Sequence, residues 1–338
     1  MKNFVCACGQ LLFFENTRCL KCGSEVGFDP QKLSMYPLPD TSVPGNKYFC
    51  KNRHDYGICN WFVTEPGAAF CLSCSLNQTI PNLLQKNRRR WWKSLEHAKR
   101  RLIYTLIRLG LPIEGKDSNP EGLAFRFIED QRTNPRVFEE HVMTGHFEGL
   151  ITINITEADD VTREISRANA GEMYRTLLGH FRHESGHYYF EKMLHGQAKI
   201  SDFRRLFGDE RANYGQAIKT YYSKKYRATR IGHYISHYAQ SHPYEDWAEV
   251  WAHYLHMIDT LETAGDYDLH CGGETFDKFD ETLAKWSELT MVLNSLNRSM
   301  GLEDAYPFVL SETTLKKLRF VHDLIYPNSL PKPGAASA

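Results

Sequence analysis

The residues with the clearest chemical potential are His183, Glu184 and His187, which form the pattern H-E-x-x-H. Four residues advance an α-helix by slightly more than one turn, so a helix places both imidazoles on one face. Two such imidazoles can bind one zinc ion, with the carboxylate of Glu184 beside a water held by that ion. The chemistry that this pattern indicates is zinc-assisted hydrolysis, with Glu184 as the general base.

A catalytic zinc ion needs a third protein ligand and an open position for water. The segment HPYEDWAEVWAHYLH, residues 242–256, supplies the candidates. We expect Glu245 to be the ligand. Glu249, one helical turn further on, would then accept a hydrogen bond from the outer N–H of a zinc-bound histidine. Asp246 and His253 are the alternative third ligands.

Hydrolysis of a carbonyl group also needs a donor for the oxygen that becomes negatively charged. His237 and Tyr238 are the main candidates, and His233 and Tyr234 lie close to them in the sequence. The run ITINI, residues 151–155, could present an open strand edge on which an extended peptide pairs. The expected reaction is therefore hydrolysis of peptide bonds in a protein or peptide substrate.

A second chemistry is carried by cysteines, of which the chain has nine. Eight fall before residue 75 in two groups of four: Cys6, Cys8, Cys19, Cys22, and Cys50, Cys59, Cys71, Cys74. Each group ends in C-x-x-C, whose two thiolates can reach one ion, so we expect two structural zinc ions. Free thiols, disulfides or an iron site are the alternatives. The ninth thiol, Cys271, is expected to be an ordinary small residue.

Composition limits the classes of protein to which the chain can belong. The 338 residues suggest about two domains, and 41 basic against 41 acidic side chains give a net charge of zero. No field of the whole protein therefore attracts nucleic acid or an anionic membrane. The first residues, MKNFVCACGQ, do not resemble a signal peptide, and no apolar run is long enough to span a membrane. We expect a cytoplasmic protein.

The chain divides where the cysteine-rich segment gives way to helical periodicity. We expect a zinc-ribbon region at 1–84, a second domain at 85–330 and a loose tail at 331–338. In the second domain the pattern predicts two strands, 123–128 and 149–155. It also predicts helices at about 88–110, 170–194, 201–207, 213–225, 244–263, 276–297 and 312–325. The expected fold class is α+β, mainly α.

Four stretches together resemble a family of bacterial zinc-binding metallopeptidases, in which zinc ribbons precede a gluzincin-like peptidase domain. They are FFENTRCLKCG, CNWFV with CLSCSLNQTIPNL, YRTLLGHFRHESGHYYFE, and HPYEDWAEVWAHYLH. The resemblance implies a zincin-type domain with a small β-sheet and one catalytic zinc ion. It implies His183, His187 and Glu245 as the zinc ligands and Glu184 as the base. Ala248 and Glu249 fit the second helix of gluzincins.

Two other classes of function compete with the peptidase. In one, the chain is a non-catalytic, zinc-binding regulatory module, which has no need of a general base such as Glu184 between its ligands. In the other, the ribbons bind nucleic acid through Arg88–Arg90 and Trp91–Trp92, helped by Lys47, Lys51 and Arg53. Such binding would weaken steeply with salt. The sequence favours the peptidase, with the ribbons as a structural or recognition module.

Overall fold

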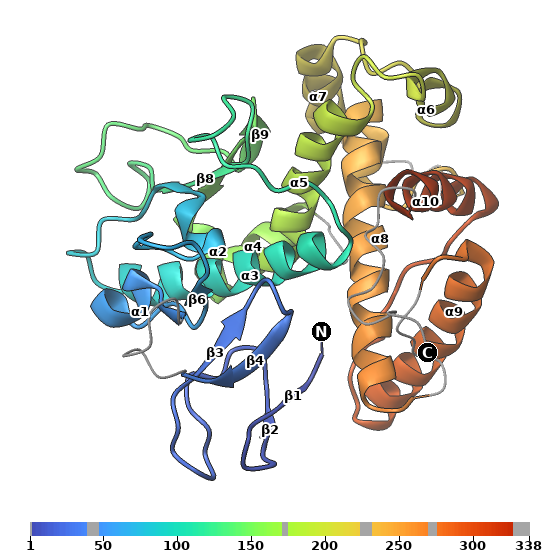
Figure 1. Ribbon diagram of the computed structural model, residues 1–338. Coiled ribbons are helices and arrows are strands. Elements are labelled where there is room, and N and C mark those ends of the chain that lie inside the picture. Colours follow the sequence, from blue (N-terminus) through green and yellow to red (C-terminus); the bar gives the residue numbers. More distant parts are fainter. Residues whose placement is uncertain (1, 39–46, 171–174, 224–231, 270–275, 327–338) are drawn as a thin grey trace. The chain divides into compact units, whose positions relative to one another are not determined.

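The computed structural model describes residues 2–38, 47–170, 175–223, 232–269 and 276–326 (Figure 1). The chain forms two compact units, one of residues 1–168 and 175–181 and the other of residues 169–174 and 182–338. Most of the described elements are helices, and the strands form small sheets of two or four, so the fold is α+β, mainly α, as predicted. None of the described helices combines the length and apolar character that a membrane span requires.

The cysteine-rich segment consists of short strands and two short helices in the first unit. Three antiparallel pairs are present: β1 (Phe4–Val5) with β2 (Leu11–Leu12), β3 (Val26–Asp29) with β4 (Ser34–Pro37), and β5 (Tyr48–Phe49) with β6 (Phe62–Val63). The helices are α1 (Lys51–Tyr56) and α2 (Leu72–Ser75). Aromatic rings make the core, with Phe28 4.8 Å from Trp61 and Phe14 5.4 Å from Tyr104 between ring centres.

A four-stranded sheet follows in the same unit, in the order β7 (Asn77–Thr79), β8 (Ala124–Ile128), β10 (Leu150–Asn154), β9 (Gly145–Phe147). The first three strands are parallel, and β9 is antiparallel. The long helix α3 (Arg88–Arg108) connects β7 to β8. Because β7 comes from the cysteine-rich segment, the backbone hydrogen bonds of this sheet join residues on both sides of position 85.

The two strands predicted for this sheet are present, but the predicted open edge is not. Strands are present at 124–128 and 150–154, close to the predicted ranges. The expected open edge at 151–155 is wrong, because β10 pairs with β8 on one side and with β9 on the other. The edge strand on that side is β9, which the sequence pattern did not indicate. Alternation of apolar residues shows which side chains are buried, but it does not show which strands are neighbours.

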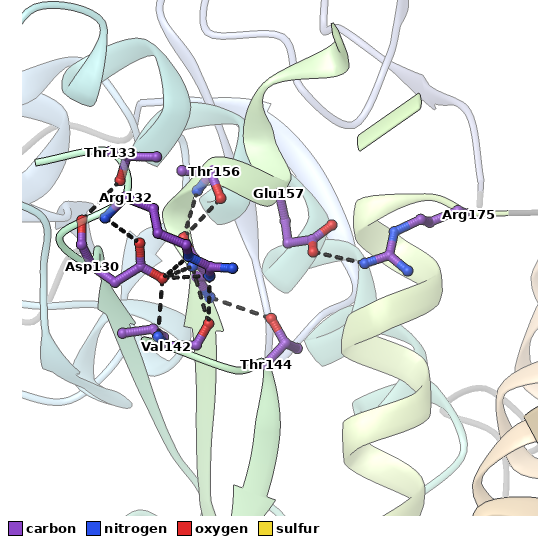
Figure 2. A network of polar contacts seen from close by, with 9 residues as sticks. Asp130, Arg132, Thr133, Val142, Thr144, Thr156, Glu157 and Arg175 are labelled. Carbon is purple, nitrogen blue, oxygen red and sulfur yellow. Dashed lines mark hydrogen bonds and ion pairs between the residues drawn. The ribbon is translucent and has the colours of Figure 1, made fainter. Parts of the chain in front are cut away.

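A buried carboxylate organises the loop that leaves β8 (Figure 2). Asp130 is fully buried and accepts hydrogen bonds from the Arg132 Nε at 3.0 Å, the Val142 backbone N–H at 3.0 Å and the Asn154 Nδ2 at 3.1 Å. Asn154 is the last residue of β10, so the loop is attached to the sheet. A buried carboxylate that accepts several hydrogen bonds can stabilise the fold, whereas a buried carboxylate without donors destabilises it.

Helices η1 (Ile155–Ala158) and α4 (Asp160–Ala170) follow the sheet, and α5 (Leu177–Met193) crosses from the first unit into the second. The helix predicted at 170–194 therefore begins later than expected. The helix at 160–170 was not predicted, and its apolar Val161 and Ile165 are exposed at 67% and 57%. The sequence places Val161 and Ile165 at helical spacing, but two apolar residues in a short and otherwise polar run are a weak signal.

The named elements in the described part of the second unit are all helices. Its remaining elements are α6 (Ile200–Phe207), α7 (Tyr214–Ser223), η2 (Tyr238–Gln240), α8 (Pro243–Asp266), α9 (Phe279–Ser299) and α10 (Glu312–Ile325). Each α-helix lies within a few residues of its predicted range. Helix α8 is the central element, since α6, α9, α10 and η2 all pack against it. Trp247 and Trp251 of α8 are fully buried. Cys271 and the tail 331–338 lie outside the described residues.

Candidate metal centres

The H-E-x-x-H pattern lies on α5 and its candidate third ligand on α8, and these helices lie side by side (Figure 1). They approach each other closely at Gly186. A Cβ atom at Gly186 would lie 2.9 Å from the Cα of Ala248 and 3.2 Å from the Cβ of Trp251. The indole N–H of Trp247 donates to the Gly186 carbonyl oxygen at 2.8 Å, and that of Trp251 donates to the Ser185 hydroxyl at 3.1 Å. Helices α5 and α8 are therefore held together beside the candidate site.

His183, His187 and Glu245 converge at this crossing. One ligand atom from each lies within 4.8 Å of the others. The Nε2 of His183 is 3.0 Å and the Nε2 of His187 is 3.5 Å from the Oε2 of Glu245. Glu245 lies in the first turn of α8, where the side chain of His242 caps the helix by accepting from the Tyr244 N–H at 3.1 Å. The structure thus brings together the three residues predicted as ligands.

Glu249 contacts the outer face of His183, as the sequence analysis expected. Its Oε1 is 2.7 Å from the Nδ1 of His183, so the imidazole can donate there while its Nε2 faces Glu245. Burial alone would raise the pKa of both glutamates. The charges and hydrogen bonds of His187 and His183 instead lower the pKa of Glu245, and those of His183 lower the pKa of Glu249. Both carboxylates are therefore ionised at neutral pH, which suits a cation.

The two alternative third ligands are engaged elsewhere. Asp246 pairs with Lys317 of α10 at 2.5 Å, and the Nε2 of His253 is 2.7 Å from the hydroxyl of Tyr306. Successive helix positions are rotated by about 100°, so Asp246 and His253 project from α8 in other directions than Glu245. Lys317 also donates to the backbone oxygen of His233 at 2.8 Å, and its ammonium lies 4.7 Å from the ring centre of Tyr234.

Three tyrosines surround the cluster, and only one of them was a candidate from the sequence. Tyr214 of α7 donates to the Oε1 of Glu245 at 2.8 Å. Tyr244 stacks on His187, with 4.2 Å between ring centres. Tyr238 lies 5.8 Å from the ring of His183, and burial followed by the charge of Glu245 raises its pKa above the usual range. The neighbouring candidate His237 immediately precedes η2.

Glu184 lies on α5 between the two histidines and is 6% exposed. Burial is the main cause that raises the pKa values of Tyr214, Tyr238 and Tyr244, and the charge of Glu245 adds to it in all three. For Tyr244 the charge of Glu191 is larger in effect than that of Glu245. The negative charge of Glu184 makes a smaller contribution to each of the three pKa values. The carboxylate is therefore within electrostatic range of all three phenols. Tyr214 and Tyr244 carried no distinguishing signal in the sequence, because a tyrosine on a helix is more often a packing residue than part of a site.

The eight clustered cysteines form the two groups that their spacing predicted. In each group all four sulfurs lie within 4.8 Å of one another. The Sγ atoms are 3.7 Å apart for Cys6 and Cys22 and 3.6 Å apart for Cys8 and Cys19. The Sγ atoms of Cys59 and Cys71 are 3.7 Å apart. All of these are much longer than the S–S bond of a disulfide, about 2.05 Å.

These distances fit zinc. Tetrahedral coordination with Zn–S bonds near 2.3 Å separates neighbouring sulfurs by about 3.8 Å, and Zn–N or Zn–O bonds near 2.05 Å separate their atoms by about 3.3 Å. The sulfur pairs at 3.6 and 3.7 Å and the N···O pairs at 3.0 and 3.5 Å lie close to these edges. Each four-cysteine group would complete the shell of one ion, whereas the His–His–Glu group would leave one position open.

The basic residues considered for nucleic acid make contacts within the fold. Arg88 is 8% exposed and its Nε donates to Glu129 at 2.8 Å, and the Nε of Arg89 donates to the Tyr56 backbone oxygen at 2.8 Å. Lys47 pairs with Asp29 at 2.5 Å and Arg53 with Glu25 at 2.9 Å. Several of these positive charges are therefore offset by carboxylates of the same chain.

Comparisons with known proteins agree with a cysteine-rich zinc-binding segment followed by a domain that carries the H-E-x-x-H pattern. Residues 3–85 match a family model described as a zinc-ribbon domain, and residues 87–324 match one described as "Putative zinc-binding metallo-peptidase". Uncharacterized proteins of Mycobacterium bovis and Mycobacterium tuberculosis are 41% identical over 336 residues, covering 96% of this chain and 95% of theirs. No solved structure matches the chain. The chain therefore belongs to the family described as "Putative zinc-binding metallo-peptidase" and carries an N-terminal zinc-ribbon domain.

Proposed function

We propose that the protein is a zinc-dependent peptidase whose active site lies at the crossing of α5 and α8. The observation that carries the proposal is the convergence of His183, His187 and Glu245 on one point, with the buried carboxylate of Glu184 on the same helix as the two histidines. Three protein ligands with an open fourth position characterise catalytic zinc sites, whereas structural sites use four protein ligands.

A zinc ion held by these residues would act as a Lewis acid and lower the pKa of a bound water to about 7. Glu184 accepts a proton from the attacking water and transfers it to the amine that leaves when the peptide C–N bond breaks. Glu249 accepts from the Nδ1 of His183, at 2.7 Å, and so fixes the tautomer in which Nε2 can bind the metal.

The carbonyl oxygen of the substrate gains negative charge during the attack and needs a donor. Tyr238 is the better placed of the two candidates from the sequence, because its ring lies 5.8 Å from that of His183. Its raised pKa keeps the hydroxyl protonated at neutral pH, so it remains able to donate. We assign this role to Tyr238 in preference to His237.

We further propose three zinc ions for each chain: one at the active site and one in each four-cysteine group. The thiolate groups leave no open position for a substrate, so their ions stabilise the fold. Zinc bound in this way contributes on the order of 10 kcal/mol to the folding of small domains. The ribbons then serve as a structural or recognition module for the protein or peptide substrate, in a protein that works in the cytoplasm.

The test combines metal content with cleavage of an unfolded protein such as reduced casein. The wild type should contain three zinc ions, and His187→Ala should contain two and be inactive. Glu184→Gln should retain all three ions and lose activity by 100-fold or more, on the order that general-base catalysis supplies. Glu281→Gln, which changes an exposed carboxylate on α9, is the control and should match the wild type.

Two outcomes would contradict the proposal. A zinc content that His187→Ala leaves unchanged would show that the α5 histidines do not bind metal. Glu184→Gln with the activity of the wild type would remove the proposed base. Three zinc ions without cleavage of any unfolded substrate would instead support the regulatory module as the function.

A further inference from the structure

The second four-cysteine group lies against charged side chains that are buried in α3. Its sulfurs belong to residues that are at most 3% exposed. Glu96, Lys99 and Arg100 of α3 are equally buried, with exposures of 0%, 0% and 1%. Buried charges are costly unless other groups compensate them. The partners of these three side chains therefore indicate what α3 contributes to the site.

Glu96 and Lys99 compensate each other. The ammonium of Lys99 lies 3.0 Å from the carboxylate of Glu96 and also donates to the side-chain oxygen of Asn77. The amide of Asn77 donates to Glu96 at 2.7 Å, and the indole N–H of Trp92 donates to it at 3.1 Å. The single negative charge of Glu96 is thus balanced by Lys99, which leaves the charge of Arg100 in excess.

Arg100 is the group without an adequate partner of its own. Its Nη1 is 3.8 Å from the Oε2 of Glu96, and the Sγ of Cys74 is 4.0 Å from the same oxygen. Its Nε and Nη1 have no hydrogen-bond partner among the residues that the structure describes. Burial opposes the charge, yet Cys59, Glu96, Cys74 and Cys71 together raise the pKa of Arg100 above its usual value.

A zinc ion bound by four thiolates would supply the negative charge that Arg100 needs nearby. One Zn²⁺ with four thiolates carries a net charge of −2, and here its sulfurs would be shielded from water. We propose that Arg100 is the charge partner of this group, so that α3 supplies the outer shell of the second zinc site. The proposal rests on zinc occupying that site and is independent of peptidase activity.

The first four-cysteine group provides an internal comparison. Cys22 is exposed and Cys8 is half-buried, so water can solvate the negative charge of that site. A solvated anion needs less compensation from the protein than a buried one. Loss of Arg100 should therefore affect the metal at the second site and spare the metal at the first.

The test follows the metals in the full-length, zinc-loaded chain. Release of zinc to an excess of 4-(2-pyridylazo)resorcinol is timed for the wild type, Arg100→Met, Arg100→Lys and the exposed control Arg90→Met. Cadmium-113 NMR of cadmium-exchanged protein then distinguishes the two thiolate sites, and Cys22→Ser identifies the signal of the first site. A change in only one of the two thiolate signals indicates an electrostatic effect at that site, because a general loss of stability would change both signals.

In Arg100→Met we expect one zinc ion to leave about 10-fold faster or more, the size of effect seen when outer-shell partners of a metal are removed. The second-site cadmium signal should shift, and Arg100→Lys and Arg90→Met should behave like the wild type. Unchanged release in Arg100→Met, or equal shifts at both sites, would overturn the proposal. If Arg100→Met does not fold, Arg100→Lys decides: a wild-type rate supports the proposal, and a 10-fold faster rate overturns it.

Discussion

The two oxygens of Glu245 have different partners, and this difference shapes the candidate active site. Oε2 faces the imidazoles of His183 and His187, whereas Oε1 accepts a hydrogen bond from Tyr214 at 2.8 Å. An oxygen that is hydrogen-bonded elsewhere is less available to a metal, so Tyr214 favours binding of the ion through Oε2 alone. One-oxygen binding preserves the open position that a water requires.

Replacing Tyr214 by phenylalanine tests this role, because it removes the hydroxyl and keeps the ring. We expect Tyr214→Phe to weaken zinc binding at the active site by about 10-fold, since outer-shell hydrogen bonds orient the ligand. The measurement is competition with a chelator of known affinity, followed by the kinetics of the remaining activity. Tyr222→Phe, whose ring on the same helix is 58% exposed, is the matched control and should bind zinc as the wild type does. Equal zinc affinities in all three proteins would exclude an orienting role for Tyr214.

At the scale of the elements, the active site depends on how closely α5 and α8 approach. Gly186 lies within the H-E-x-x-H pattern and faces Ala248, which lies between Glu245 and Glu249. On each of the two helices, the residue at the close approach therefore lies between residues that would hold or orient the metal. Packed interiors transmit small displacements, so a larger residue here should act on the metal site.

Gly186→Ala adds a single Cβ atom that would lie 2.9 Å from the backbone of Ala248. Because that neighbour is backbone, the helices must separate, and we expect a loss of about 1–3 kcal/mol in the free energy of unfolding. The zinc affinity of the active site should fall with it. Denaturant unfolding and zinc titration measure the two effects.

Gly215→Ala on α7 is the control, since the nearest atom to its Cβ is the Asn213 side-chain oxygen at 3.8 Å. An alanine is favoured over glycine inside an exposed helix by up to about 1 kcal/mol, so this variant should be as stable as the wild type or more stable. If Gly186→Ala were as stable as Gly215→Ala, the close approach would not constrain the helices.

At the scale of the whole molecule, two histidines of α8 make stability depend on pH. Burial, followed by the positive charge of Arg182, lowers the pKa of His256 to about 4, although Asp259 opposes the shift. Burial also lowers the pKa of His253 well below its usual value, and its ring bonds to the hydroxyl of Tyr306. Both imidazoles are therefore neutral in the folded protein at neutral pH.

This predicts destabilisation in mild acid. The unfolded chain takes up a proton at His256 below about pH 6.5, whereas the folded chain does so only near pH 4. Stability is therefore complete above pH 6.5 and falls as the pH drops from 6.5 to 4, by up to about 3 kcal/mol for this residue. Thermal unfolding at fixed zinc concentration, recorded every half pH unit, measures the loss.

His256→Gln, which cannot titrate, should lose less stability than the wild type over the same interval. The comparison between the two proteins matters because the metal sites also lose ions in acid, and that loss is common to both. Parallel curves for the wild type and His256→Gln would show that His256 does not contribute to the pH dependence.

Features fixed by local spacing could be predicted from the sequence. Each C-x-x-C pair and the H-E-x-x-H pattern place two ligands within a few residues, so the local backbone alone brings those two donors together. Helices α6, α8, α9 and α10 were found within a few residues because each buries apolar side chains. Helix α7 was found from its spacing, although none of its residues is buried. Helix α4 was not found, since it offers only Val161 and Ile165 at helical spacing in a short, otherwise polar run.

Contacts between distant segments were decided only by the tertiary structure. The sequence left Glu245, Asp246 and His253 as alternatives, and the packing of α8 against α5 and α10 turns only Glu245 toward the histidines while Asp246 meets Lys317. Arg100 carried no distinguishing signal in the sequence, yet the fold buries it next to Glu96, whose Oε2 also lies 4.0 Å from the Sγ of Cys74. Periodicity reports that a face is buried, whereas the neighbour that covers it depends on long-range packing.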